Sequence, residues 1–434
     1  MRSLLAITLF FGLSAGVAFG QLPSLGTEPP RGPLYPAPTA PLAADSMRGD
    51  NAYMRRIAEW TPCDGGVSAP FTVPFAWANR QVLLRICSAP SDYDVRVNGR
   101  TVAYVADGSV PAEVNVTRAV QEGRNEVEIL LRQTPALAQI ESWESGSEPR
   151  QPGAAWVLSQ PTLRVRDVVA RTWRAADESD YTAEVAMVVK SEALNPRTSR
   201  LWYELLSPAG TVAASGHRDI TLDMRREDTV RFLAHLPADS LWSAERPQRY
   251  TLRLKTQHEG RYDEYTEFRL GLRSAELRDG QLLVNGSPVT LRTASVSPGA
   301  TAAELADVRR SGRNAVVLAP GIASPSLYET CDTLGLYVVA TAAIDARRGG
   351  DSRRVGGSPA NDPAWREAFI ERARNSYHTA KRHPSVVAFL LARNAANGIC
   401  LYESYLAMKA EQETRPFVYP EAAGEWNSDH LTIE

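Results

Sequence analysis

Polar residues that could take part in chemistry follow several buried, strand-like segments in the last third of the sequence. The segment 386–391 leads to Arg393 and Asn394. Neighbouring segments lead to Asp345 and Glu421. Since the carboxyl ends of parallel strands meet at one edge of a sheet, we expect these side chains to face a common groove. The candidates for this polar groove are Arg292, Asn314, Asp345, Arg347, Arg393, Asn394 and Glu421.

What the groove can do depends on whether it holds a carboxyl group that can give and take a proton. General acid–base catalysis needs a titratable side chain placed at the reacting atom. The segment 386–391 ends in a guanidinium and an amide, and neither serves as a proton donor in this sense. A carboxylate would have to come from another strand.

Buried strands alternate with helical patterns from about residue 288 to residue 421. Five apolar strand-like segments are separated by helices, of which 362–383 is the longest. This alternation indicates a parallel sheet with helices packed on it. Arg292 falls within the first strand and Asn314 starts the second, whereas the other candidates follow later strands.

Two β-rich blocks precede this region. Between about 66 and 135, apolar and polar residues alternate between Asn-Gly and similar turns, which predicts a β-sandwich. A second block, from about 160 to 273, has strands at the spacing of an immunoglobulin-like sandwich. Residues 21 to about 50 are rich in Pro, Gly and Ala, which is typical of an extended arm or linker.

The N-terminus predicts export. Arg2 precedes a short apolar run, and Ala18 and Gly20 place small residues at positions −3 and −1 of a cleavage site before Gln21. Later apolar runs are too short to cross a bilayer. With a net charge of −2, neither a nucleic acid nor an anionic surface is indicated as a partner. We therefore expect a periplasmic or secreted protein without a membrane span.

The chain has four cysteines, whose spacing matches no zinc pattern. Cys63 and Cys87 lie in the same predicted sandwich and could pair in an oxidising compartment. Free buried cysteines are equally common, so both alternatives stay open.

The order of these blocks resembles glycoside hydrolase family 2, the β-galactosidase and β-glucuronidase type. The motifs that carry the resemblance are "VRVNGRTVAYV", "GLRSAELRDGQLLVNGSPVTLR", "NAVVLAPGIASPSLYETCDTLGLYVV", "HPSVVAFLL" and "TRPFVYPE". The resemblance implies a jelly-roll-like β-sandwich, an immunoglobulin-like β-sandwich and an incomplete (β/α) TIM-type barrel. The expected parts are a signal peptide (1–20), an arm (21–55), the first sandwich (56–158), the second sandwich (159–274) and a partial barrel with strands one to five (275–434).

The resemblance also implies where the family's acid/base residue would stand. The fourth barrel strand usually ends in Gly-Asn-Glu, and here the corresponding residues are Ala392, Arg393 and Asn394. Retaining glycosidases use two carboxyl groups about 5 Å apart. The nucleophile lies beyond the fifth strand, and residues 290–434 are fewer than the roughly 250 of a full barrel. We therefore expect a replaced acid/base residue and no strand for the nucleophile.

The resemblance also implies that the ligands of the family's metal site are replaced in this sequence. It uses the acid/base Glu together with a Glu and a His after strand three, and these positions hold Asn394, Asp345 and Arg347. Arg347 would place a fixed cation where Mg²⁺ sits, so Asp345 and Arg347 are expected to pair. No metal and no cofactor are expected.

Other carboxylates and two histidines are possible substitutes for the missing groups. Glu421, Glu425 and Asp429 follow the fifth strand, and a solvated loop is the favoured interpretation. His378 and His383 are better explained as packing or capping residues than as catalysts.

The first sandwich is the expected module for sugar binding, although its loops do not define a site. Trp143, Trp156 and Trp426 could stack on sugars, but aromatic residues at domain seams more often belong to the core.

The leading hypothesis is an exported, non-catalytic family member that binds carbohydrate or serves as a scaffold. The alternative is an active retaining β-glycosidase of the β-galactosidase type, which would need a replacement carboxylate pair or strands from a second polypeptide. A degenerate product without a settled function is a third possibility. Half a barrel leaves its first and fifth strands as open edges, so we expect a second copy, a partner protein or the arm at 21–50 to cover them.

Overall fold

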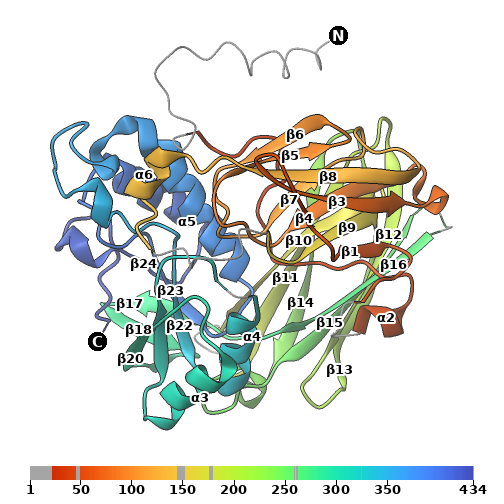
Figure 1. Ribbon diagram of the computed structural model, residues 1–434. Coiled ribbons are helices and arrows are strands. Elements are labelled where there is room, and N and C mark those ends of the chain that lie inside the picture. The colour runs from red at the N-terminus through yellow and green to blue at the C-terminus, as the bar shows by residue number, and fades with distance from the viewer. Residues whose placement is uncertain are drawn as a thin grey trace.

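The structure is a computed structural model that describes residues 22–44, 49–143, 152–174, 179–258, 260, 262–323 and 325–433. The predicted signal peptide, residues 1–20, lies outside these ranges. Two antiparallel β-sandwiches stand beside a parallel α/β unit (Figure 1), which confirms the predicted fold class. Within the described ranges, none of the helices is long and apolar enough to cross a membrane.

The first sandwich packs a five-stranded sheet, ordered β2-β3-β8-β5-β6, against a four-stranded sheet, ordered β1-β9-β4-β7. Between β5 and β6, Asn98 and Gly99 have φ values of 49° and 75°, as a two-residue hairpin turn requires. The sandwich extends two residues beyond the predicted 56–158 at each end, because β1 and β9 pair with each other. The strands are β1 (Met54–Ile57), β2 (Thr61–Cys63), β3 (Gly66–Val73), β4 (Gln81–Ile86), β5 (Tyr93–Val97), β6 (Arg100–Val105), β7 (Ala112–Asn115), β8 (Gly123–Leu131) and β9 (Ala155–Gln160).

The second sandwich has a three-stranded sheet, ordered β10-β11-β14, and a four-stranded sheet, ordered β13-β12-β15-β16. Alternate residues of β11 are buried, because one face of the strand packs against the facing sheet. Tyr203 and Phe232 stack across the core, with ring centroids 3.9 Å apart. The strands are β10 (Leu163–Trp173), β11 (Tyr181–Ser191), β12 (Arg197–Leu206), β13 (Val212–Leu222), β14 (Glu227–Leu236), β15 (Tyr250–His258) and β16 (Tyr262–Leu270).

The α/β unit contains a parallel sheet whose five strands lie in chain order, β20-β21-β22-β23-β24. Thr301 and Glu304 form a reciprocal capping box that starts α3. The strands are β20 (Thr293–Val296), β21 (Ala315–Leu318), β22 (Tyr337–Thr341), β23 (Val386–Leu390) and β24 (Phe417–Val418), and the helices are α3 (Ala302–Arg310), α4 (Pro325–Leu334), α5 (Arg366–Ala380) and α6 (Ile399–Lys409). A small antiparallel sheet precedes it, formed by β17 (Ala275–Arg278), β18 (Gln281–Val284) and β19 (Ser287–Pro288). The remaining helix, α2, spans Ala40–Ala44, and the 3₁₀ turns are Phe75–Trp77, Pro135–Gln139, Ala238–Ser240, Arg347–Gly349, Pro359–Asn361, Pro363–Trp365 and Pro420–Ala422.

Both faces of the parallel sheet are covered by the chain itself. Val316 and Leu318 of β21 point into the core formed with the helices. Val317 points to the opposite face, the one that would line a closed barrel, and packs in a cluster with Trp242 and residues of β17 and β18. This second cluster explains why the strands are buried apolar runs although the sheet stays open.

The outer edge of β24 is covered by the segment that follows it, which differs from our expectation. The Phe417 amide donates to Asp429 Oδ2 (2.9 Å), and the Asp429 amide donates to the Phe417 carbonyl (2.9 Å). The Tyr419 amide donates to Ser428 Oγ (2.9 Å). At the other edge, β20 is only partly buried and Ser295 in its middle is exposed.

The described residues of the arm, 22–44 and 49–50, form no bridge with either edge strand of the parallel sheet. Within residues 22–44, Leu25 bridges to Tyr104 of the first sandwich and Ala37 bridges to Tyr265 of the second. The described part of the arm therefore lies along the two sandwiches, and our expectation that the arm covers the barrel edges was wrong. The position of the arm is set by ion pairs with side chains that are far away in the sequence.

Buried ion pairs hold the arm in place. Glu28 binds both Arg164 and Lys190 of the second sandwich, at 3.1 and 2.8 Å. Arg31 binds Glu113 of the first sandwich at 2.8 Å. The arm thus joins the two sandwiches through charges that burial shields from water.

The four cysteines are free thiols. Cys63 ends β2 in one sheet of the first sandwich, and Cys87 follows β4 in the other sheet. Packed sheets lie about 10 Å apart, which exceeds the reach of a disulfide. The possible Cys63–Cys87 pair is therefore not formed.

Candidate functional site

The loops after β22, β23 and β24 bring five of the seven predicted groove residues to one end of the parallel sheet. Backbone hydrogen bonds extend the sheet beyond its strands, because Arg393 donates to the Ile344 carbonyl (2.9 Å) and Ala346 donates to the Arg393 carbonyl (3.1 Å). We call the resulting group the mouth cluster. Its members are Asp345, Arg347, Arg393, Asn394 and Glu421.

Asp345 is the centre of the mouth cluster and is only 2% exposed. Two nitrogens of Arg347 donate to Asp345 Oδ2, Nη2 at 2.6 Å and Nε at 3.0 Å. Asn394 Nδ2 donates to Oδ1 at 3.0 Å. The predicted pairing of Asp345 with Arg347 is therefore confirmed.

Asn394 stands between two carboxylates. Its side chain donates to Asp345, and its backbone amide donates to Glu421 Oε1 at 3.3 Å. It has a φ of 53°, a left-handed conformation that Asn tolerates better than most residues. The backbone geometry therefore supports an amide at this position.

The electrostatics of Asp345 exclude it as a proton donor. Burial by itself would raise its pKa, but the hydrogen bonds from Arg347 and Asn394 outweigh burial and lower the pKa below the ordinary value. Asp345 is therefore ionised near neutral pH, and its oxygens are already occupied. Glu421 is exposed and is the carboxylate of the mouth cluster that faces solvent.

The remaining two predicted residues lie at the opposite end of the sheet. Arg292 directly precedes β20 instead of lying within it, and Asn314 directly precedes β21. Asn314 Oδ1 accepts from the Arg292 amide (2.7 Å), and Asn314 Nδ2 donates to the Thr290 carbonyl (3.0 Å). These two side chains join strand starts and take no part in the groove.

The structure shows an aromatic ledge formed by Trp426, one of the three tryptophans that could stack on sugars, and by Tyr402, which the sequence did not single out. Trp426 is 58% exposed and stacks on Tyr402 of α6, with ring centroids 5.1 Å apart and an interplanar angle of 10°. Glu425 accepts from the Tyr402 hydroxyl and pairs with Arg353. The interpretation of Trp426 as a core residue was therefore wrong. Tyr402 and Arg353 carry no signal in the sequence because α6 and the loop at 351–358 have no recognisable motif.

The ledge is held beside the mouth cluster by buried contacts between two loops. Asn397, which follows β23, and Asn427, which follows β24, exchange amide hydrogen bonds of 3.2 and 2.7 Å. The Tyr419 hydroxyl donates to the Ala395 carbonyl. These contacts fix the loop that carries both Glu421 and Trp426.

Metal binding has little support at the mouth cluster. Across the described ranges, the structure has no group of three or more His, Cys, Asp or Glu side chains able to hold a metal ion. Arg347 occupies the Asp345 oxygens that would have to serve as ligands.

The two histidines of interest have structural contacts. His383 Nδ1 lies 2.7 Å from Asp332 Oδ2, and its ring stacks on Tyr328 at 5.1 Å. His378 lies 3.6 Å from Glu411. Both are packing residues of the kind expected.

The order of two sandwiches and a parallel α/β unit, with polar residues at the carboxyl ends of its strands, defines a class of glycoside-hydrolase-like proteins. Residues 163–273 match the family model described as "Glycosyl hydrolases family 2", and residues 302–433 match "Glycosyl hydrolases family 2, TIM barrel domain". The chain belongs to glycoside hydrolase family 2, which confirms the resemblance seen in the sequence.

Curated relatives include β-galactosidases. The protein from Aeromonas hydrophila subsp. hydrophila is 27% identical over 387 residues, which are 82% of this chain and 37% of the relative. That from Priestia megaterium is 24% identical over 372 residues, 80% of this chain and 35% of the relative. The chain thus spans little more than a third of their length.

Solved structures show the same fold. Bacteroides uniformis β-glucuronidase 2, covalently bound to cyclophellitol-6-carboxylate aziridine, has a TM-score of 0.66 and 17% identity and covers 91% of this chain and 52% of its own. A putative β-galactosidase from Bacteroides fragilis has a TM-score of 0.66 and 15% identity and covers 92% of this chain and 64% of its own.

Proposed function

We propose that this family 2 protein is a non-catalytic carbohydrate-binding protein that uses the end of the sheet formed by the mouth cluster. The observation that carries the proposal is Asn394 at the family's acid/base position, hydrogen-bonded to Asp345. An amide cannot protonate a leaving oxygen, and the loss of a positioned acid costs about 10²- to 10⁴-fold in rate. The adjacent Asp345 is ionised and held by Arg347, so it does not replace the acid.

Carbohydrate binding is supported by the neighbouring groups. A sugar presents apolar C–H faces and a rim of hydroxyls, so a site for it combines an aromatic plane with hydrogen-bonding side chains. The exposed face of Trp426 would supply the plane, and Arg393 and Glu421 would supply donors and acceptors. The mouth cluster thus keeps the groups that recognise a sugar without those that cleave it.

Glycan-array screening followed by titration calorimetry tests this proposal. We expect a galactoside- or glucuronide-containing glycan to bind, and Trp426→Ala to weaken binding by about tenfold, the loss of one aromatic contact. Trp173→Ala is the matched control, since Trp173 is 44% exposed on the second sandwich, away from the mouth cluster. If no glycan bound, or if both variants bound as well as the wild type, the mouth cluster would not be a sugar site.

We further propose that the protein is exported, with Gln21 as the first mature residue. The support is the apolar run after Arg2 and the small residues Ala18 and Gly20. N-terminal sequencing of protein recovered from the periplasm or the medium tests this. A chain that retained residue 2 in those fractions would contradict it.

We also propose that a second chain, either another copy or a partner protein, pairs with β20. This strand is the edge of the parallel sheet that the described part of the chain leaves partly exposed, with Ser295 at its centre. Open strand edges favour pairing with other strands. Light scattering should show a dimer that Ser295→Pro converts to monomer, because proline removes an edge donor. A monomer in the wild type together with no co-purifying partner would refute this.

A further inference from the structure

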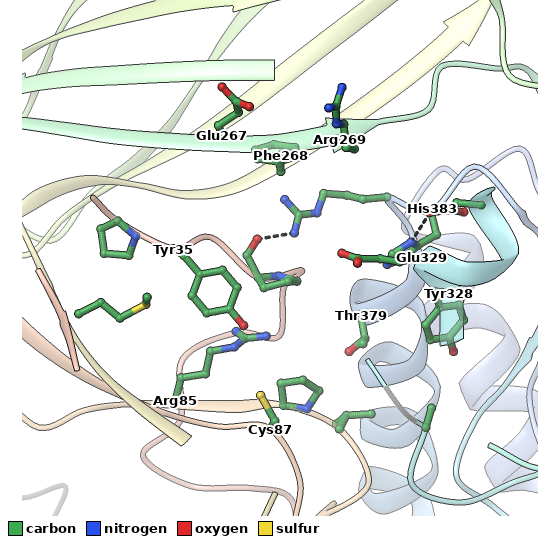
Figure 2. A pocket seen from close by; sticks show the side chains of 18 of the residues that line it. Tyr35, Arg85, Cys87, Glu267, Phe268, Arg269, Tyr328, Glu329, Thr379 and His383 are labelled. Atoms are coloured by element: carbon green, nitrogen blue, oxygen red, sulfur yellow. Dashed lines mark hydrogen bonds and ion pairs between the residues drawn. The ribbon is translucent and has the colours of Figure 1, made fainter. Parts of the chain in front are cut away.

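A cavity of about 540 Å³ lies where the arm, both sandwiches and the helices of the α/β unit meet. Figure 2 shows Tyr35 and Arg85 on one side of it, Tyr328 and Thr379 on the other, and Phe268 along a third wall. The size is that of a pocket for a small organic molecule. None of the five residues of the mouth cluster lines this cavity, so it is a separate site.

One wall carries a buried positive charge that the protein does not fully satisfy. Arg85 is 2% exposed, and its Nη1 lies 2.7 Å from Glu113 Oε1. Glu113 also binds the buried Arg31 at 2.8 Å, so two guanidinium groups share one carboxylate. Arg85 Nε has no hydrogen-bond partner among the described residues. A buried N–H donor without an acceptor is rare in proteins, and here the side chain that carries it lines a cavity.

The opposite wall is a polar face of α5. Ser376 and Thr379 of α5 are three residues apart, and His383 lies beyond the end of the helix; all three line the cavity. Thr379 Oγ1 is buried and has no partner in the described part of the chain. Thr379 therefore lies across the cavity from Arg85.

The walls between these polar groups are aromatic. Tyr35, Phe268 and Tyr328 line the cavity, and the Arg382 guanidinium lies 4.6 Å from the centre of the Phe268 ring. Arg382 is anchored by a hydrogen bond to the Pro33 carbonyl (2.6 Å). Flat apolar walls combined with cations suit a ring that bears a negative group.

We propose that this junction cavity binds a small organic oxyanion, a molecule with one carboxylate or phosphate group on a flat apolar body. The anionic group binds at the Arg85 wall, and the flat body packs against the aromatic walls and extends towards Thr379. Since the ligand touches four parts of the chain, its binding stabilises their arrangement in proportion to ligand concentration.

Titration calorimetry of the full chain with benzoate, phenyl phosphate and the neutral benzyl alcohol tests the proposal. We expect at least one of the two anions to bind and the alcohol to bind at least tenfold more weakly, because a charge-assisted hydrogen bond is lost. Preference between benzoate and phenyl phosphate identifies the carboxylate or the phosphate. Absence of binding by both anions, or equal binding of the alcohol, overturns the proposal.

Two variants locate the binding. Thr379→Phe fills the cavity from α5 and should abolish anion binding, whereas Thr221→Phe, at an exposed position of β13, should leave it unchanged. Arg85→Met should weaken binding at least tenfold, with the exposed Arg246→Met as its control. Should Arg85→Met fail to fold, Thr379→Phe still decides. Anion binding that survives Thr379→Phe places the anion elsewhere and refutes the inference.

Discussion

Replacing Glu113 by Gln should destabilise the folded chain by about 3 kcal/mol at pH 7, the lower end of the range for breaking a buried pair. Glu113 is the carboxylate that Arg31 and Arg85 share, at 2.8 and 2.7 Å, and all three side chains are 2–5% exposed. Glutamine keeps the shape but leaves two buried cations without a counter-charge. Breaking a buried ion pair in this way typically costs about 3–5 kcal/mol.

The pKa of Glu113 gives an independent value for the stabilisation that this carboxylate contributes, and the two values are similar. Burial alone would raise this pKa, but Arg31 and Arg85 outweigh burial and lower it from 4.5 to about 2. Because the pKa is lowered in the folded state, the stabilisation is present above about pH 4.5 and is lost as the pH falls towards 2. A difference of about 2.5 pKa units corresponds to about 3 kcal/mol.

Urea unfolding at pH 7 and at pH 3 measures both effects. Glu113→Gln should unfold at lower urea than the wild type at pH 7, and the difference should shrink at pH 3, where part of the wild-type contribution is already lost. Glu126→Gln is the matched control, since Glu126 is exposed on β8 of the same sandwich and its replacement should change stability by no more than about 0.5 kcal/mol. An unchanged midpoint for Glu113→Gln, or an equal loss of stability at both pH values, would show that Glu113 does not stabilise the fold through these two ion pairs.

Three further outcomes are expected. Arg347→Met should lower stability by about 1 kcal/mol, because the buried Asp345 loses its ion-pair partner; the loss is modest since Arg347 itself is largely exposed. Thermal unfolding measures this, and an unshifted midpoint would contradict it. Asp429→Ala should lower the free energy of unfolding by about 1–3 kcal/mol, because the Phe417 amide loses its acceptor at the β24 edge. Urea unfolding measures this, and a midpoint equal to that of the wild type would contradict it. Burial raises the pKa of Glu141 to about 7. Between about pH 4.5 and 7 the Glu141 carboxyl is therefore protonated in the folded state but ionised in the unfolded chain, so stability should fall as the pH rises through that range. Glu141→Gln should flatten this dependence in unfolding curves taken from pH 5 to 8, and a slope equal to that of the wild type would count against the assignment.

The sequence predicted the layers of the fold because burial patterns are local. The fully apolar segment 386–391 reads as a strand covered on both faces, and β23 is indeed buried along its whole length. The first sandwich was visible from alternating residues and from the turn at Asn98-Gly99. What the sequence could not predict was the cover of β24, which depends on the Asp429 side chain bonding to Phe417.

The residues of the candidate site that follow the carboxyl ends of parallel strands could be predicted from the sequence. Asp345 and Asn394 were expected together because each follows a parallel strand, and they are hydrogen-bonded. Arg292 was misplaced because β20 starts one residue later than its apolar pattern suggested. Trp426 was misjudged because exposure depends on how its loop folds over Tyr402, a contact between segments with no shared motif.

Hydrolysis of an aryl β-galactoside and an aryl β-glucuronide by the purified protein shows whether the mouth cluster has a working acid/base group. Wild type, Asn394→Glu and Glu421→Ala should be assayed together. We predict no turnover above background by the wild type or by either variant. Turnover by the wild type that disappears in Glu421→Ala would contradict the account and assign the chemistry to Glu421.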